Sequence, residues 1–277
     1  MHRREKSTPG SHRLSVALGE YDTGWHDPEQ SLARAREVAQ HAKDAGADTL
    51  VLPEMCASGF TMDADNFAEP ANGKSARALA AIAAEHQLWL VAGLSIRRDG
   101  SYRNSAITFG PDGSALATYD KQRLFGHAGE PAVYAAGTGP CVVRLGGLAV
   151  ALFICFDLRF PELFREVGPD IDACVIVANW PAGRQRHWEI LNQARAIENQ
   201  CYVVAVNRVG EADGLAYEGG SMILDPWGER CDKQVARGSL RIGEVSRQLV
   251  DRARGSFSVV EDRRAPSSDG AVAANTA

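Results

Sequence analysis

Residues 148–165 read Leu-Ala-Val-Ala-Leu-Phe-Ile-Cys-Phe-Asp-Leu-Arg-Phe-Pro-Glu-Leu-Phe-Arg. The first seven are apolar, and they lie between Gly146-Gly147 and Cys155. A run this short and bounded favours a strand buried on both faces, although periodicity alone does not exclude a buried helix. Cys155 would then close a core strand at the sheet edge where ligands bind in open α/β sheets. Free cysteines are more often inert buried residues, so this stretch alone leaves both interpretations open.

The bulk properties of the 277-residue chain are those of a globular protein with its own large core. The net charge of −5 does not favour a nucleic-acid or anionic membrane partner, and no apolar run approaches the roughly 20 residues of a membrane span. Six cysteines without a C-x-x-C pair predict neither a disulfide framework nor a zinc site. The basic, polar N-terminus does not look like a secretory signal. We therefore expect a cytoplasmic protein.

Strands and helices alternate along the chain, with a hairpin in each half, which predicts a mixed α/β sheet rather than a purely parallel one. Strands are expected at 14–18, 48–54, 88–94, 105–109, 114–119, 141–145, 148–154, 171–178, 202–206, 221–224 and 239–242. Helices are expected from Asp27, as N-cap with Gln30 completing a capping box, to Gly46, at 75–86, at 187–199 and after a Ser246 cap.

The predicted helix 187–199 carries Ile190, Leu191, Ala194 and Ile197 on one face. Two long loops, 55–73 and 122–140, have the length of functional segments. We expect one domain at 13–261 between disordered tails at 1–12 and 262–277.

Three reactive side chains each follow an apolar strand: Glu54, Lys121 and Cys155. If those strands run in the same direction, the side chains converge on one edge. An acyl-transfer site needs a nucleophile, a base and a cation for the oxyanion. A free thiol has a pKa of about 8.5 and is therefore mostly protonated near neutral pH. A nearby Lys121 would favour the thiolate, and Glu54 could take the proton. The alternative is a buried Glu–Lys ion pair beside an inert cysteine.

Three stretches resemble the signatures of the nitrilase superfamily of carbon–nitrogen hydrolases. They are Leu52-Pro53-Glu54-Met55, Tyr119-Asp120-Lys121-Gln122-Arg123-Leu124-Phe125 and Ile154-Cys155-Phe156-Asp157-Leu158-Arg159-Phe160-Pro161-Glu162. They come in the family's order and spacing, and Asn179-Trp180-Pro181 and 194–200 resemble later family segments. The resemblance covers about residues 13 to 250.

This resemblance implies a four-layer αββα sandwich of mixed sheets, paired through its cysteine-bearing side into a homodimer. It implies that Cys155 attacks an amide or nitrile carbon with Glu54 as general base. Lys121 and the backbone N–H of Phe156 would stabilise the tetrahedral intermediate. Ammonia or an amine leaves, and water activated by Glu54 cleaves the thioester. Glu130, in the loop after the lysine, would position water or substrate, and neither a metal nor an organic cofactor is required.

Within the superfamily the chain resembles bacterial ω-amidase-like members. Phe125-Gly126-His127-Ala128-Gly129-Glu130 and Asn179-Trp180-Pro181-Ala182 carry this resemblance, whereas the Asp-Ile-Pro-Gly run of mammalian-type ω-amidases is absent. It implies a small-molecule substrate that is an ω-amide of a small dicarboxylic acid, such as 2-oxoglutaramate. The same triad could serve an N-carbamoyl amidohydrolase or a nitrile hydrolase.

A dicarboxylic substrate needs a cation for its far carboxylate, and the arginine fork suits one best. Arg184 and Arg123 are the candidates, because each lies in a loop beside the expected site; both could instead be solvated. Phe60, Tyr134 and Trp180 could wall the pocket or simply pack in the core.

Other interpretations are weaker. His127 or His187 could pair with the cysteine, but neither follows a strand as Glu54 does. Arg159 and Glu162 are expected to hold the turn below the nucleophile rather than touch substrate. A non-catalytic small-molecule binding protein and an acyltransferase are the alternatives of other classes.

Overall fold

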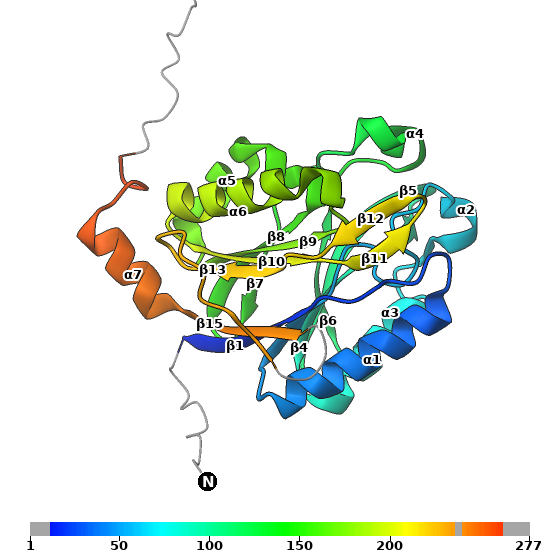
Figure 1. The fold of residues 1–277 in the computed structure, drawn as a ribbon, viewed down its shortest axis with the longest axis horizontal. Helices are drawn as coiled ribbons and strands as arrows, with labels where there is room; N and C mark the ends of the chain where they lie inside the picture. The colour runs from blue at the N-terminus through cyan, green and yellow to red at the C-terminus, as the bar shows by residue number, and fades with distance from the viewer. Residues whose placement is uncertain (1–11, 236–239, 263–277) are drawn as a thin grey trace, which may run out of the picture.

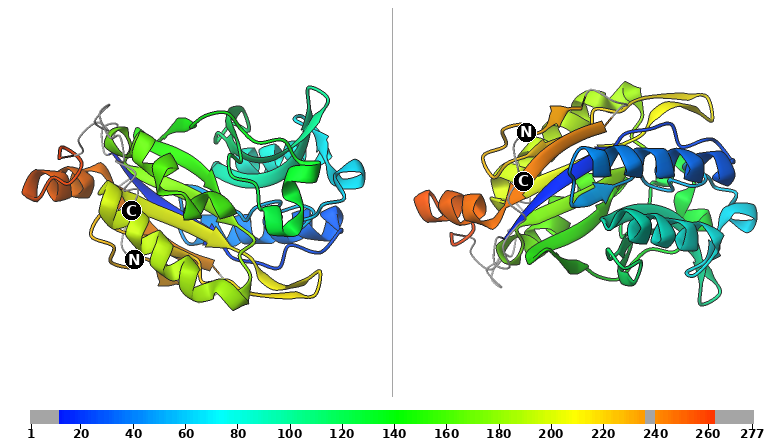
Figure 2. Two further views of the ribbon diagram at one scale, coloured as in Figure 1. Left: turned by 90° about the horizontal axis from the view of Figure 1, so that it is seen from above. Right: turned by 90° about the horizontal axis from the view of Figure 1, so that it is seen from below.

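The computed structural model describes residues 12–235 and 240–262. These residues form two β-sheets packed face to face, with helices on the outer side of each (Figures 1 and 2). The arrangement confirms the predicted four-layer sandwich of mixed sheets. Most of both predicted tails, and Ser239 at the start of a predicted strand, lie outside the described residues. In the described part of the chain, no helix is long and apolar enough to cross a membrane.

The first sheet runs, in spatial order, through β14 (Lys233–Gln234), β15 (Leu240–Ser246), β1 (Arg13–Gly19), β2 (Thr49–Val51), β4 (Trp89–Arg98), β5 (Ser101–Phe109) and β6 (Ala115–Asp120), with β3 (Glu69–Pro70) beside β4. Strands β1, β2 and β4 are parallel, and β5 and β6 follow as an antiparallel hairpin. Because β6 is antiparallel to β5, it runs in the same direction as β2. The segments that follow β2 and β6 therefore leave the sheet at the same edge.

The second sheet has the order β13 (Met222–Leu224), β10 (Tyr202–Asn207), β9 (Ala173–Ala178), β8 (Leu148–Ile154) and β7 (Val142–Leu145). Its three central strands are parallel. A separate two-stranded ribbon is formed by β11 (Val209–Ala212) and β12 (Leu215–Glu218). It projects from the body of the molecule beyond β10 (Figure 1).

Helices α1 (Pro28–Asp44) and α3 (Lys74–His86) cover the first sheet, and α5 (Pro161–Val167) and α6 (Gln185–Asn199) cover the second (Figure 2). The remaining helices are α2 (Ala64–Phe67), α4 (Glu130–Val133) and α7 (Arg247–Ser256), and two 3₁₀ turns, η2 (Cys155–Arg159) and η4 (Ala182–Arg184), border the site described below.

Strand β8 shows why the chain needs an uninterrupted apolar run. Its alternate residues Leu152 and Ile154 pack between the two sheets. Phe153, between them, packs outward against α5 and α6. A strand buried on both faces has no solvent side, so every position is apolar. The prediction of a doubly buried strand ending at Cys155 is confirmed.

Helix ends and faces agree only partly with the sequence-based expectations. Asp27 caps α1 by accepting from the Gln30 backbone N–H at 3.0 Å, and Gly46 follows the helix with φ +78°. Ser246 occupies the N-cap position of α7, but its side chain makes no capping hydrogen bond, so that detail was wrong. On α6 the expected apolar face is not the buried one. Ile190 and Ile197 are each 50% exposed.

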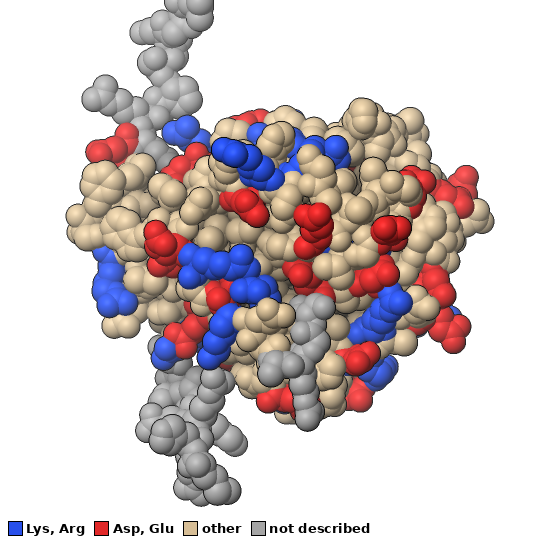
Figure 3. Space-filling view, viewed as in Figure 1, with Lys and Arg blue, Asp and Glu red and all other residues tan. Residues whose placement is uncertain are grey.

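The buried face of α6 instead contains Trp188, Asn192, Arg195, Ala196 and Asn199. Arg195 donates to the Leu158 carbonyl at 2.7 Å, so the helix uses polar side chains to hold its neighbour. Acidic and basic residues are interspersed over the face of the molecule seen in Figure 3.

Candidate active site

A cavity of about 360 Å³ opens where segments following strands of both sheets meet. Aromatic side chains make up much of its wall: Trp25, Phe60, Phe125, Phe156, Trp180 and Tyr217. Lys121 and Cys155 also line it, as do two arginines, Arg159 and Arg184. Pockets of this size and aromatic character, with a few convergent polar groups, commonly bind small molecules.

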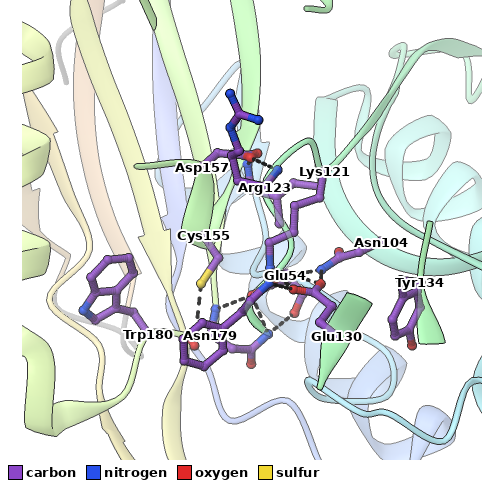
Figure 4. A network of polar contacts seen from close by, with 12 residues as sticks. Glu54, Asn104, Lys121, Arg123, Glu130, Tyr134, Cys155, Asp157, Asn179 and Trp180 are labelled. Carbon is purple, nitrogen blue, oxygen red and sulfur yellow. Dashed lines mark hydrogen bonds and ion pairs between the residues drawn. The ribbon is translucent and has the colours of Figure 1, made fainter. Parts of the chain in front are cut away.

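A fully buried cluster of charges lies beside the cavity (Figure 4). The Lys121 Nζ is 2.9 Å from Glu54 Oε1 and 2.9 Å from Glu130 Oε2. Glu54 follows β2, Lys121 follows β6, and Glu130 begins the short helix α4. The structure therefore brings together the strand-end carboxylate and ammonium that the sequence pattern predicted to converge.

Two asparagines hold these carboxylates in place. Asn104 donates to Glu54 Oε1 at 2.7 Å and to Glu130 Oε1 at 2.8 Å. The backbone N–H of Asn179 donates to Glu54 Oε2 at 2.9 Å, and its side-chain amide donates to the Glu54 carbonyl at 2.6 Å. The Asn179 contacts join the first sheet to the second. Neither asparagine was predicted as a site residue.

The thiol lies on a tightly anchored turn. Cys155 begins η2 with φ +44°, a conformation that non-glycine residues adopt at a cost. Its Sγ is 3.8 Å from the Asn179 carbonyl, so the second sheet brings it next to the Glu54 cluster (Figure 4). Under the turn, the buried Asp157 accepts from the backbone N–H groups of Ile154 at 3.0 Å and Arg123 at 2.8 Å. One carboxylate thus ties the cysteine turn to the segment after Lys121.

The electrostatics of the cluster set the resting protonation states. Burial raises the pKa of Cys155 well above its usual range, and Glu54 adds to this, while Lys121 and a backbone hydrogen bond to Asn179 oppose it. Burial would lower the pKa of Lys121, but Glu54 and Glu130 outweigh it, so the pKa lies above the ordinary value. The resting site therefore holds a neutral thiol and an ammonium ion.

Such an arrangement can carry out acyl transfer. A thiol faces a cavity, a carboxylate beside it can accept its proton, and an ammonium can balance negative charge on an oxygen of the reacting group. Among the described residues there is no cluster of three His, Cys, Asp or Glu side chains that could hold a metal ion.

The predicted pocket residues divide into two groups. Phe60, Phe156, Trp180 and Arg184 line the cavity. Tyr134 does not: it lies on the far side of Glu130 from the thiol, with its hydroxyl within hydrogen-bond distance of Ser95 Oγ and the Thr61 carbonyl (Figure 4).

Arg123 is also away from the cavity. Its guanidinium pairs with Glu162 at 3.2 Å, where both side chains are partly exposed, and it points away from the Glu54 cluster (Figure 4). Arg159, by contrast, was expected to hold the turn, yet it lines the cavity with its guanidinium 4.7 Å from the Trp180 ring centroid. Its neighbour in the cavity wall is Arg184, whose charge contributes to lowering the pKa of Arg159.

The sequence-based reasoning also missed the β11–β12 hairpin, which brings Asp213, Leu215 and Tyr217 to the cavity. Its turn is Asp213-Gly214, and both residues have positive φ, 49° and 70°. An Asp-Gly pair is a strong hairpin signal, so this element was detectable from the sequence.

Fold and site together define an αββα sandwich whose cavity holds a thiol beside a buried carboxylate and ammonium ion. The carbon–nitrogen hydrolase family profile matches residues 15–254. The Escherichia coli K12 protein called omega-amidase YafV is 35% identical over 219 residues, 78% of this chain and 84% of that protein. The 2-oxoglutaramate amidase of Bacillus subtilis 168 is 31% identical over 256 residues, 91% of this chain and 98% of that protein.

A solved structure extends the likeness to three dimensions. XC1258 from Xanthomonas campestris, a CN-hydrolase superfamily protein with an arsenic adduct in its active site, has a TM-score of 0.86 at 30% identity, covering 92% of this chain and 98% of that one. The chain belongs to the carbon–nitrogen hydrolase family, as its three motifs predicted, and it is an enzyme of that family.

Proposed function

We propose that this enzyme hydrolyses the ω-amide of a small dicarboxylic acid through a thioester on Cys155 and releases ammonia. The observation that carries the proposal is the buried Glu54–Lys121–Glu130 cluster, whose lysine lines the same cavity as the thiol and two arginines. The cluster supplies the chemistry, and the arginines supply a place for a second, anionic group. The names of the E. coli and B. subtilis relatives point to the same substrate class.

The reaction proceeds in two halves. Cys155 attacks the amide carbon as its proton passes to Glu54, because its raised pKa leaves it a thiol at rest. Lys121 and the Phe156 N–H stabilise the oxyanion, and the nitrogen leaves as ammonia carrying the proton from Glu54. Water then attacks the thioester while Glu54 takes its proton, and the acid leaves as Cys155 regains a hydrogen. Glu130 holds Lys121 and orients the water.

Arg159 and Arg184 form the carboxylate subsite in this proposal. Burial and the charge of Arg184 both lower the pKa of Arg159, so a bound anion would relieve the repulsion between them. Each guanidinium also stacks on a wall of the cavity, Arg159 on Trp180 and Arg184 on Phe125. Arg123 has no part in it, because its guanidinium lies elsewhere.

Ammonia release from glutaramate, succinamate, 2-oxoglutaramate, N-carbamoyl amino acids and simple nitriles tests the substrate class. We expect the ω-amide acids to be preferred and Cys155→Ala to abolish release. Preference for a carbamoyl compound or a nitrile would replace the proposed substrate. Full ammonia release by Cys155→Ala would defeat the thioester mechanism.

Arg184→Ala tests the carboxylate subsite. We expect KM for glutaramate to rise at least tenfold, because a charge-assisted hydrogen bond contributes roughly 1.5–3 kcal/mol. The KM for butyramide, which has no carboxylate, should stay the same. Arg186→Ala is the matched control, because Arg186 is an exposed arginine at the start of α6 and lies outside the cavity lining. Equal KM values for glutaramate in the two variants would remove Arg184 from the site.

We further propose that the enzyme is a homodimer paired through α6 and works in a reducing cytoplasm. The exposed Ile190 and Ile197 on α6 support the dimer. The exposed Trp227 precedes Gly228, which lies close to the Ile197 side chain. The thiols of Cys174 and Cys201 lie 3.8 Å apart without forming a disulfide, which suits a reducing compartment.

A further inference from the structure

A guanidinium lies fully buried behind one wall of the cavity. Arg208 follows β10 and is 0% exposed. Its Nη2 donates to Asp22, a carboxylate whose side chain is 41% exposed, and its Nε donates to the Val209 carbonyl at 3.2 Å. Within the described residues, its Nη1 has no hydrogen-bond partner. A buried cation with an unsatisfied donor is costly, so packing alone does not account for Arg208.

Tyr217 is the residue through which Arg208 meets the cavity. The Arg208 Cζ is 4.7 Å from the centroid of the Tyr217 ring, within the range of a cation–π contact. Tyr217 is 7% exposed and lines the same cavity as Cys155. Tyr217 thus contacts the buried cation and also borders the cavity.

The phenol of Tyr217 keeps its proton. Burial raises the pKa of Tyr217 to about 12, with Arg208 lowering it and the nearby Cys155 and Glu54 raising it. At neutral pH the hydroxyl is therefore available as a hydrogen-bond donor. Cys155, the proposed nucleophile, lines the same cavity as Tyr217.

The base of the β11–β12 hairpin is fixed on both strands. On β11, Gly210 has φ +93° and lies so close to Asp22 that a Cβ there would come within 2.6 Å of the carboxyl carbon. At the end of β12, the Gly219 carbonyl accepts from the side chain of Asn207 at 2.8 Å. Tyr217 is therefore presented from a rigid base, as a substrate-binding side chain requires.

We propose that Tyr217 binds the substrate, donating a hydrogen bond from its hydroxyl to the amide group that is cleaved, and that Arg208 is a positioning residue that holds the ring. This inference rests on the proposed attack of Cys155 on an amide. It concerns the reacting amide and not the distal carboxylate. The contribution of Tyr217 is therefore the same for amides with and without a carboxylate.

Tyr217→Phe removes only the hydroxyl. We expect kcat/KM to fall at least tenfold for both glutaramate and butyramide, while the rate at which iodoacetamide alkylates Cys155, followed by mass spectrometry, stays within twofold of wild type. Tyr102→Phe is the control, because Tyr102 is a partly exposed tyrosine outside the cavity lining. An unchanged kcat/KM on both amides, or a loss confined to glutaramate, overturns the assignment.

Arg208 is tested through the pair. Arg208→Lys keeps a cation and should retain more kcat/KM than Arg208→Met, and Tyr217→Phe combined with Arg208→Met should lose little beyond the worse single variant. Additive losses would show that Arg208 does not act through Tyr217. If wild type cleaves butyramide and not glutaramate, the proposed substrate fails while the Tyr217 comparison on butyramide still decides this inference.

Discussion

At the scale of single residues, the site depends on buried charges that each have a fixed set of partners. Lys121 contacts two carboxylates, and Asn104 bridges the same pair. The raised pKa of Lys121 follows from the two carboxylates, and the same contacts keep Glu54 aligned beside the thiol.

Asp157 gives a prediction for the dependence of stability on pH. Burial raises its pKa from the ordinary 3.8 to about 6, although backbone N–H donors oppose the shift. Between these values the folded protein holds a proton that the unfolded chain releases. Asp157 therefore contributes stability that is fully present below about pH 4 and is lost as the pH rises through 6.

The difference in unfolding free energy between wild type and Asp157→Asn should consequently shift by about 2 kcal/mol against wild type from pH 4 to pH 7, at 1.36 kcal/mol per pKa unit. Urea denaturation at several pH values measures it. The asparagine variant is its own control for all other titrating groups, and a constant difference across this range would contradict the prediction.

Sequence reasoning singled out three residues that follow strands and missed both site asparagines. Glu54, Lys121 and Cys155 each interrupt an apolar run, so their position marks them. Asn104 lies within β5, where nothing in the local pattern distinguishes a polar core residue from a surface one. Asn179 ends β9 as the others end their strands, and the same rule would have found it.

At the scale of elements, the turn after β8 stores backbone strain at the nucleophile. Cys155 has φ +44°, which glycine adopts freely and other residues adopt at a cost of about 1–2 kcal/mol. We therefore expect Cys155→Gly to be at least as stable as Cys155→Ala in thermal or urea unfolding. At Ala81, exposed within α3, the change to glycine should cost about 1 kcal/mol instead. The same loss at both positions would argue against strain at residue 155.

Elements with a clear hydrophobic pattern were predicted well, and elements whose buried face depends on tertiary contacts were not. The short, glycine-bounded apolar run favoured the strand that β8 forms, whereas α6 buries Asn192 and Arg195 and exposes Ile190. Hydrophobic pattern alone could not show this, because Arg195 is held by a contact to another element, the Leu158 carbonyl. The strands of the β11–β12 hairpin have only four residues each, so only its Asp-Gly turn signalled it.

At the scale of the whole molecule, the exposed apolar residues of α6 predict association. Ile190→Asp combined with Ile197→Asp should convert the proposed homodimer to a monomer in light scattering after size-exclusion chromatography. Leu116→Asp is the control, because Leu116 is 45% exposed on β6, in the other sheet. A wild-type monomer, or a dimer that survives both α6 changes, would contradict the pairing.

The hydrogen bonds from Asn179 to Glu54 cross the boundary between the two sheets. The thiol follows a strand of the second sheet, and its carboxylate follows a strand of the first. Neither sheet alone supplies all of the reacting groups. The turnover rate therefore depends on how firmly the two sheets stay packed against each other. We expect heating to abolish activity as soon as the packing between the sheets loosens, before either sheet itself unfolds.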